Sequence, residues 1–147
     1  MNRAAALACA ALALALVGCG GVSLSLSQLR GNATRACQAA ATRAQRIPYP
    51  SSGAQTTAFL KNSVPVLSDQ LSNLRSLTPP ANLASKYQIS IGALSEQLHL
   101  LQQTVVRLDA GAEPLGAIRA LQRQLSSSEA RGDAAWRELG IPACATT

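Results

Sequence analysis

The chain has few of the side chains on which catalysis and metal binding depend. It contains one histidine and seven acidic residues, and its aromatic residues are one Trp, two Tyr and one Phe. Nucleophilic catalysis needs a base and an orienting group beside the nucleophile, and Ser126-Ser127-Ser128 has neither at a motif spacing. The sequence also has no glycine-rich phosphate-binding loop. We therefore expect a protein that is not an enzyme and that uses no cofactor.

The single histidine belongs to the one short motif with metal-binding potential. Glu96 and His99 form a Glu-x-x-His pair, which is half of the motif that holds paired iron ions in helical bundles. Leu94, Leu98 and Leu101 recur at the spacing of a buried helical seam, and the Glu–His pair falls outside that seam. No second histidine exists to complete the motif. We interpret the two residues as a surface pair and predict no metal site.

The N-terminus has the pattern of an export signal. Met1-Asn2-Arg3 carries one positive charge, and the uncharged run Ala4–Val17 is too short for a membrane-spanning helix of about 20 residues. The run ends in Leu16-Val17-Gly18-Cys19, which resembles the lipobox of bacterial lipoproteins. The alternative is an ordinary secretory peptide followed by an incidental cysteine.

The lipobox resemblance implies a modification and a location. Residues 1–18 would be a signal peptide that is removed, and the thiol of Cys19 would form a thioether to a diacylglycerol. More than one acyl chain gives stable anchoring, so the membrane is the first expected partner. The expected location is the extracytoplasmic face of the cell membrane, with the protein held by its lipid.

The four cysteines then have three different fates. Cys9 leaves with the signal peptide and Cys19 carries the lipid, so Cys37 and Cys144 remain. Because the exported compartment is oxidising, one disulfide between them is the simplest outcome. A free thiol pair and metal ligation are the alternatives. A bridge that closes a loop of about 100 residues would stabilise the fold by about 4.7 kcal/mol.

The rest of the chain is long enough for one domain, and its apolar residues recur with the periodicity of helices. Residues 19–27 are interpreted as a lipidated tether and residues 28–147 as the folded domain. Apolar residues at three- and four-residue spacings predict four helices, at about Leu26–Arg46, Gln55–Leu77, Leu83–Leu108 and Glu113–Leu139. Short connections favour antiparallel neighbours, so we expect an all-α, up-down-up-down four-helix bundle with one disulfide.

Prolines and glycines mark the ends of the predicted helices, with one exception. Pro65 lies inside the second helix, where it removes a backbone donor and clashes with the carbonyl four residues back. We expect either a kink near Lys61–Ser63 or a fresh start with Ser63 as the N-cap. Elsewhere, Pro114 predicts a helix start and Gly140 a helix end.

A second resemblance covers most of residues 30–145. Its first motif is Leu77-Thr78-Pro79-Pro80-Ala81-Asn82-Leu83, which precedes a long leucine heptad. Its second motif is the ending Leu139-Gly140-Ile141-Pro142-Ala143-Cys144-Ala145, whose cysteine accompanies a cysteine in the first helix. This arrangement resembles a group of small exported helical proteins of high-GC Gram-positive bacteria. The resemblance implies the helical fold and the disulfide, and it implies no function.

The first predicted helix is basic throughout. It carries Arg30, Arg35, Arg43 and Arg46 and no acidic residue, and the last three arginines share a face. Each cation close to an anionic membrane is worth about 1 kcal/mol, so this face is a candidate contact for anionic lipid or an acidic wall polymer. A solvated face is the alternative interpretation. Nucleic acid is not an expected partner, because an exported domain with so few aromatic residues offers no stacking surface.

Two hypotheses of function remain after these exclusions. The first is a lipid-anchored envelope protein that presents a helical surface to a protein or wall partner. The alternative is a carrier of a small apolar ligand, with a cavity made by the Ala-, Gly- and Ser-rich seams of the first and fourth helices. Trp136, the only tryptophan, is expected to shield the Cys37–Cys144 bridge or the end of the bundle rather than to bind a ligand.

Overall fold

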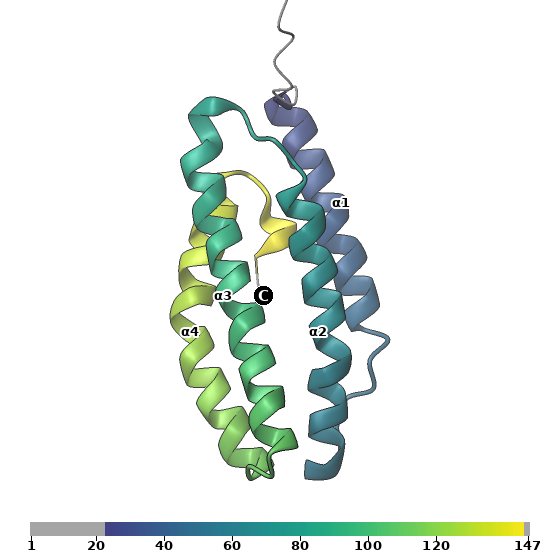
Figure 1. The fold of residues 1–147 in the computed structure, drawn as a ribbon. Coiled ribbons are helices and arrows are strands. Elements are labelled where there is room, and N and C mark those ends of the chain that lie inside the picture. Colours follow the sequence, from purple (N-terminus) through teal and green to yellow (C-terminus); the bar gives the residue numbers. More distant parts are fainter. Residues whose placement is uncertain (1–22, 146–147) are drawn as a thin grey trace, which may run out of the picture.

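Four consecutive helices run up and down along the long axis of the molecule (Figure 1). The computed structural model describes residues 23–145, so the predicted signal peptide and Cys19 lie outside the described residues. The helices are α1 (Leu26–Ala44), α2 (Gly53–Arg75), α3 (Ala84–Asp109) and α4 (Pro114–Glu138), with the 3₁₀ turns η1 (Ala81–Leu83) and η2 (Pro142–Cys144). Within residues 23–145 there is no strand. The predicted all-α, up-down-up-down bundle is confirmed.

Helix α1 begins inside the stretch that was assigned to the tether. The Ser25 hydroxyl accepts the backbone N–H of Gln28, and the Gln28 side chain accepts the backbone N–H of Ser25, which completes a capping box. Leu24 packs against the core and donates its backbone N–H to the Thr78 carbonyl. The folded domain therefore begins before residue 28, because the cap and the partly buried Leu24 belong to it, and α1 starts at Leu26 as its periodicity predicts.

Helix α2 passes through Pro65 without interruption. The predicted fresh start at Ser63 was wrong, since the Ser63 hydroxyl donates back to the Phe59 carbonyl within the same helix. Proline leaves the carbonyl of Lys61 without its usual helical donor. Pro65 and Lys61 are both exposed, so water can solvate that carbonyl and the helix tolerates the loss.

The ends of α3 and α4 follow the predicted signals. Gly111 and Gly140 have positive φ angles of 90° and 72°, and each closes a Schellman motif at the end of its helix. At the start of α4, the Glu113 carboxylate accepts the backbone N–H groups of Gly116 and Leu115. These bonds, Gly116 first, hold the pKa of Glu113 below its usual value, because they favour the charged form.

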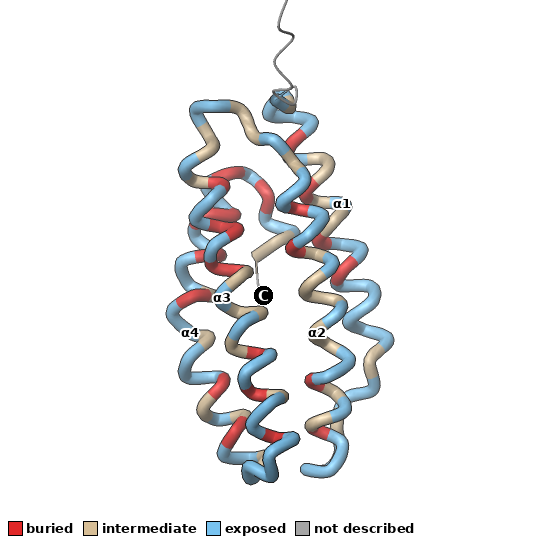
Figure 2. Tube along the Cα trace, in the orientation of Figure 1, coloured by how far each residue is buried: buried red, intermediate tan, exposed pale blue. Residues whose placement is uncertain are grey.

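The core consists of two clusters along the bundle (Figure 2). The first core cluster combines side chains from α1, α2, α3, α4 and the C-terminal segment: Leu29, Ala33, Cys37, Leu71, Leu74, Tyr87, Ile91, Leu94, Trp136, Leu139 and Ile141. The second core cluster uses α2, α3 and α4 only: Leu60, Leu101, Leu108, Ala117 and Leu121. One end of the molecule is thus packed as four helices and the other as three.

Helices α1 and α4 do not close the bundle against each other. Among the described residues, no Cα atom of α1 lies within 8 Å of a Cα atom of α4. The segment after α4 lies between them at one end, where Ile141 is fully buried and Cys144 forms the disulfide with Cys37 (Cα–Cα 5.2 Å). With 19 residues against 25, α1 is about 9 Å shorter than α4, so the gap stays open at the other end.

Candidate functional site

The four arginines predicted to lie on the first helix are all exposed, and three of them bond to other groups of the protein. The Arg30 Nε donates to the Leu139 carbonyl at 2.7 Å, which places its guanidinium over the end of α4. Arg43 forms an ion pair of 2.7 Å with Asp69 of α2, and Arg35 donates to the Asn32 side chain within α1. Arg46 is exposed beyond the end of the helix. The structure thus places two of the four arginines against other helices.

The Glu-x-x-His pair lies on the surface of α3, outside the seam as predicted. Glu96 forms an ion pair of 2.6 Å with Arg131 of α4, and His99 shares a 2.8 Å hydrogen bond with Gln103 one turn along α3. Residues 23–145 contain no group of three or more His, Cys, Asp or Glu side chains arranged to hold a metal ion.

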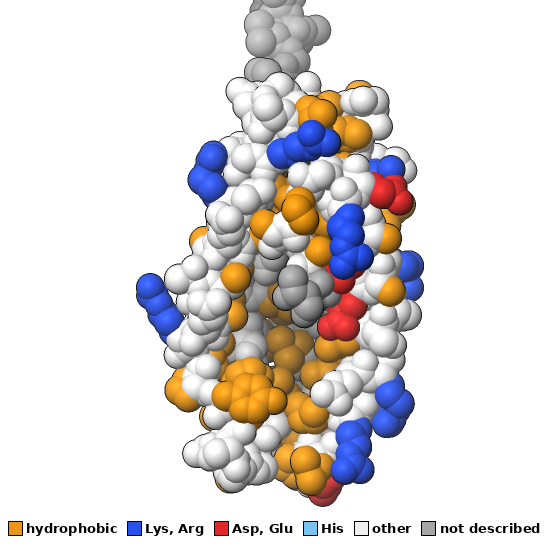
Figure 3. Space-filling model, turned by 180° about the vertical axis from the view of Figure 1, so that it is seen from behind, with side chains coloured by type: hydrophobic (Ala, Val, Ile, Leu, Met, Phe, Trp, Pro, Cys, Tyr) orange, Lys and Arg blue, Asp and Glu red, His pale blue; other side chains and the backbone are white. Residues whose placement is uncertain are grey.

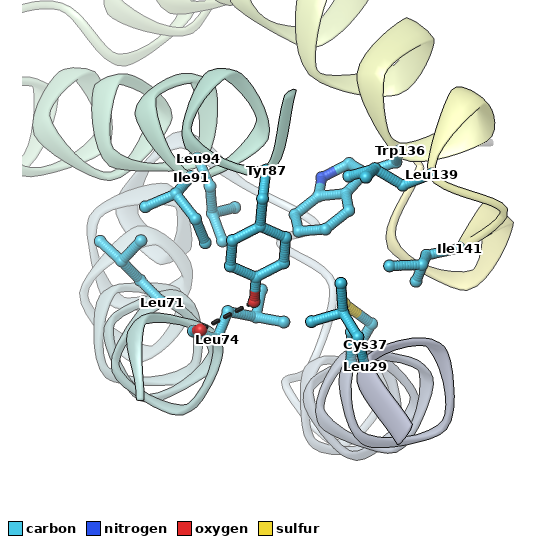
Figure 4. Close-up of a cluster of buried hydrophobic side chains, with 11 residues drawn as sticks. Leu29, Cys37, Leu71, Leu74, Tyr87, Ile91, Leu94, Trp136, Leu139 and Ile141 are labelled. Carbon is cyan, nitrogen blue, oxygen red and sulfur yellow. Dashed lines mark hydrogen bonds between the residues drawn. The ribbon is translucent and has the colours of Figure 1, made fainter. Parts of the chain in front are cut away.

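Trp136 is buried in the first core cluster, to which the disulfide cysteine Cys37 also belongs (Figure 4). Its ring packs edge-on against Tyr87, with centroids 5.7 Å apart. The Tyr87 hydroxyl donates to the Leu74 carbonyl at 2.7 Å, so a hydrogen bond crosses from α3 to the end of α2. Sequence reasoning did not assign this bond, although a tyrosine at a seam position signals the need for a buried partner.

A first cavity, of about 310 Å³, lies where α1 faces α2 near the disulfide. Its α1 wall is made of small side chains, Ala40, Ala41 and Ala44. The other walls come from α2, from Leu101 of α3 and from residues 143–145. These alanines of α1 therefore border a hollow, because α1 has no α4 side chains opposite it.

A second cavity, of about 600 Å³, lies at the three-helix end of the molecule. It is lined by residues 49–53, by Thr56 and Phe59 of α2, and by one face of α4. Two large apolar side chains at this cavity are strongly exposed, Tyr49 at 85% and Leu115 at 62%. Tyr49 also packs edge-on against Phe59, with ring centroids 5.7 Å apart.

One face of α2 forms the floor of both cavities. The lining residues Gly53, Thr56, Phe59, Ser63, Val66 and Gln70 recur at three- and four-residue spacings. The seam that packs on α3, which includes Leu60, Leu71 and Leu74, lies beside this face. We call the two cavities together the apolar groove. Figure 3 shows the hollow from behind, with hydrophobic side chains gathered inside it.

Three polar side chains on the α2 floor of the groove are bonded within the protein. The hydroxyls of Thr56 and Ser63 donate to carbonyls one turn back in α2, and the Gln70 amide donates to the Cys37 sulfur. No lysine or arginine lines either cavity. Among the described lining residues, the only charged one is Glu113, whose carboxylate accepts backbone N–H groups at the start of α4.

The small residues of α4 do not contribute to this groove. Gly132 is buried against α3, where a Cβ atom would lie 3.1 Å from the Ala93 Cβ. The small-residue seam of α4, which the carrier hypothesis predicted to line a cavity, instead serves close packing against α3. The α4 wall of the groove is instead a separate leucine-rich face with Leu115, Leu121 and Leu125.

Comparison with protein families, curated proteins and solved structures found no match to this chain. Over residues 23–145, no helix combines the length and the apolar character needed to cross a bilayer. The apolar groove and the N-terminal motif are therefore the two features of this protein that bear on its function.

Proposed function

We propose that this protein is a lipid-anchored, non-enzymatic binding protein of the extracytoplasmic face of the cell membrane. The observation that carries the proposal is the apolar groove along α2, which is bordered by α1 and the C-terminal segment at one cavity and by residues 49–53 and α4 at the other. Ligand sites in proteins are typically concave, mostly apolar and 300–1,000 Å³ in volume, and the larger cavity alone is about 600 Å³.

The exposed side chains at the groove support a role in binding. Burying a large apolar side chain is worth roughly 1.5–3 kcal/mol, so leaving Tyr49 and Leu115 in water forgoes stability. Apolar residues that gather at the edge of a hollow mark an interaction site more often than scattered ones do. A bound partner would cover both side chains together with the α2 floor.

The position of the groove suits an anchored protein. The tether precedes α1, and the start of α1 lies at the end closed by η2 and the disulfide (Figure 1). The larger cavity lies at the opposite end of the molecule, beyond the last residue of α1. Helix α1 is about 28 Å long, so the cavity lies at least that far from the start of the helix. An anchor at Cys19 would therefore direct the larger cavity away from the bilayer.

The anchor is tested by replacing the residue that would carry the lipid. The full chain and its Cys19→Ser variant are expressed in a bacterium that processes lipoproteins, in the presence of radiolabelled palmitate. We expect label and membrane association for the unchanged chain, and neither for the variant. Equal membrane association of both proteins, or absence of label from the unchanged chain, would contradict the proposal.

A further inference from the structure

We infer that the apolar groove binds an uncharged apolar chain, such as the tail of a long-chain alcohol or ester. This inference rests on the proposed binding function and specifies the ligand class. Its site is the 600 Å³ cavity between residues 49–53, α2 and α4, together with the smaller cavity farther along the same face of α2.

The charge of the lining decides against an anionic ligand in the groove. A carboxylate moved out of water needs a cation or several hydrogen-bond donors, and no lysine or arginine lines either cavity. The one ionised group at the larger cavity is Glu113. Its pKa is lowered by the backbone N–H groups of Gly116 and Leu115, so it stays negative at neutral pH and would repel a second anion.

The hydrogen bonding of the lining decides against a strongly polar ligand. On the α2 floor, the hydroxyls of Thr56 and Ser63 and one amide N–H of Gln70 already donate within the protein. A sugar or peptide backbone placed there would lose bonds to water and find few replacements, which costs free energy for each unpaired group. Phe59, Ile118 and Leu125 instead offer contacts that an apolar chain can use.

The shape of the site favours a chain over a compact molecule. The lining residues of α2 extend from Gly53 to Gln70, which is about 26 Å along the helix. The volume is divided into two cavities that follow each other along this face. A long, thin molecule can contact both, whereas a compact ligand of the same volume would occupy only the larger one.

The test uses a neutral fluorescent probe, N-phenyl-1-naphthylamine, whose emission rises in apolar surroundings. A chain that begins at Gly20 is suitable, because residues 23–145 contain helices α1 to α4, both core clusters and the disulfide. It is produced in an oxidising compartment so that the Cys37–Cys144 bridge forms. Bound probe is then displaced at pH 8 by 1-dodecanol or by dodecanoate, which share an apolar chain and differ in charge.

Two matched variants locate the binding. Gln122 and Gln124 are both exposed on α4, and only Gln122 lines the larger cavity. We expect Gln122→Trp to weaken probe binding at least tenfold by filling the cavity, while Gln124→Trp leaves it within twofold. Ala41→Trp and Ala39→Trp on α1 form the corresponding pair for the smaller cavity. Unchanged far-ultraviolet circular dichroism and melting temperature show that each variant is folded.

The inference requires dodecanol to displace the probe at a concentration at least tenfold lower than dodecanoate does. Equal or better displacement by dodecanoate would overturn it, as would equal binding by the Gln122→Trp and Gln124→Trp variants. Failure of dodecanol to displace the probe would also overturn the inference. In that case the anchored chain could still capture a protein partner from membranes. That last outcome leaves the anchored binding function intact, so the two proposals fail separately.

Discussion

At the scale of single residues, the buried polar groups are all paired within the described part of the chain. The hydroxyls of Tyr87, Thr104 and Ser128 each donate to a backbone carbonyl, and no buried side-chain nitrogen or oxygen among the described residues is left without a partner. An unpaired buried polar group costs about 1–3 kcal/mol, so this pairing allows polar side chains inside a small core. Tyr87 is the largest of them, and its burial raises the pKa of its hydroxyl well above the usual value.

Tyr87 should make the fold sensitive to alkaline pH. The unfolded chain releases this proton at about pH 10, whereas the folded chain keeps it, so stability is lost as pH rises above about 10. The loss approaches 1.4 kcal/mol per pH unit from this group. Urea unfolding at pH 8 to 11 measures it, with Tyr87→Phe as the control. We expect the variant to be about 1 kcal/mol less stable at pH 8 and to lose less as pH rises. Parallel pH curves would contradict the assignment.

Gly140 is required both for its backbone angle and for the space that it leaves to Arg30. A Cβ atom there would lie 2.7 Å from the Arg30 guanidinium, while one at Gly111 would meet nothing within 4 Å. Both glycines have positive φ, so alanine costs about 1–2 kcal/mol at either position. We expect Gly140→Ala to cost more than Gly111→Ala in urea unfolding, because Arg30 must also leave the Leu139 carbonyl. Adding Arg30→Ala should remove that excess, and an unchanged excess would show that the clash is unimportant.

At the scale of the elements, the unequal lengths of the helices create the groove. Helix α1 has 19 residues and contributes to the first core cluster only, whereas the other three helices have 23 to 26 residues and reach both clusters. Helix α2 consequently has two apolar faces, one that packs on α3 and one that faces the groove.

Pro65 should weaken α2 at a site where nothing requires it. The residue is exposed and its position in the helix interior leaves the Lys61 carbonyl without a donor. We expect Pro65→Ala to raise the free energy of unfolding by about 1–3 kcal/mol, since proline is about 3 kcal/mol less favourable than alanine in a helix interior. Pro114→Ala is the matched control, because proline is tolerated at the first position of α4. A loss of stability on replacing Pro65 would indicate a structural role for the proline.

At the scale of the whole molecule, the C-terminal segment replaces a direct α1–α4 interface. Leu139 and Ile141 are buried against α1 side chains such as Leu29, and the Cys37–Cys144 bridge holds the segment in place. The bridge joins two residues that are 107 positions apart, so it links the N-terminal helix of the domain to its C-terminal segment. The closed end of the bundle therefore depends on one covalent bond as well as on packing.

Removing the bridge should cost most of the stability of a domain this size. A Cys37→Ala, Cys144→Ala double variant loses the restriction that the bridge places on the unfolded chain, about 4.7 kcal/mol for a loop of about 100 residues. Urea unfolding of the oxidised chain and of the double variant measures the difference. The reduced, unchanged chain should match the variant within about 1 kcal/mol. A difference below 1 kcal/mol between oxidised chain and double variant would contradict the predicted role of the bridge.

The sequence was sufficient for the local features of this protein. Helix starts and ends depend on residues close together in the chain, so Pro114, Gly111 and Gly140 were readable as signals. The heptad of α3 likewise predicted its buried face and the outward position of Glu96 and His99. The lipobox at Cys19 is also a local signal, and it stays a prediction until the modification is measured.

Other features were decided only by tertiary structure. Arg30 donates to Leu139 at the end of α4 and Arg43 pairs with Asp69 of α2, so two of the four exposed arginines have partners that are distant in the sequence. The groove exists because α1 ends before α4 does and the C-terminal segment fills only one end of the gap. Helical periodicity identifies the apolar faces of a helix. It does not show which of these faces another helix covers, because that depends on the distances between helices. The chain thus determined its own helices, and their packing determined the groove.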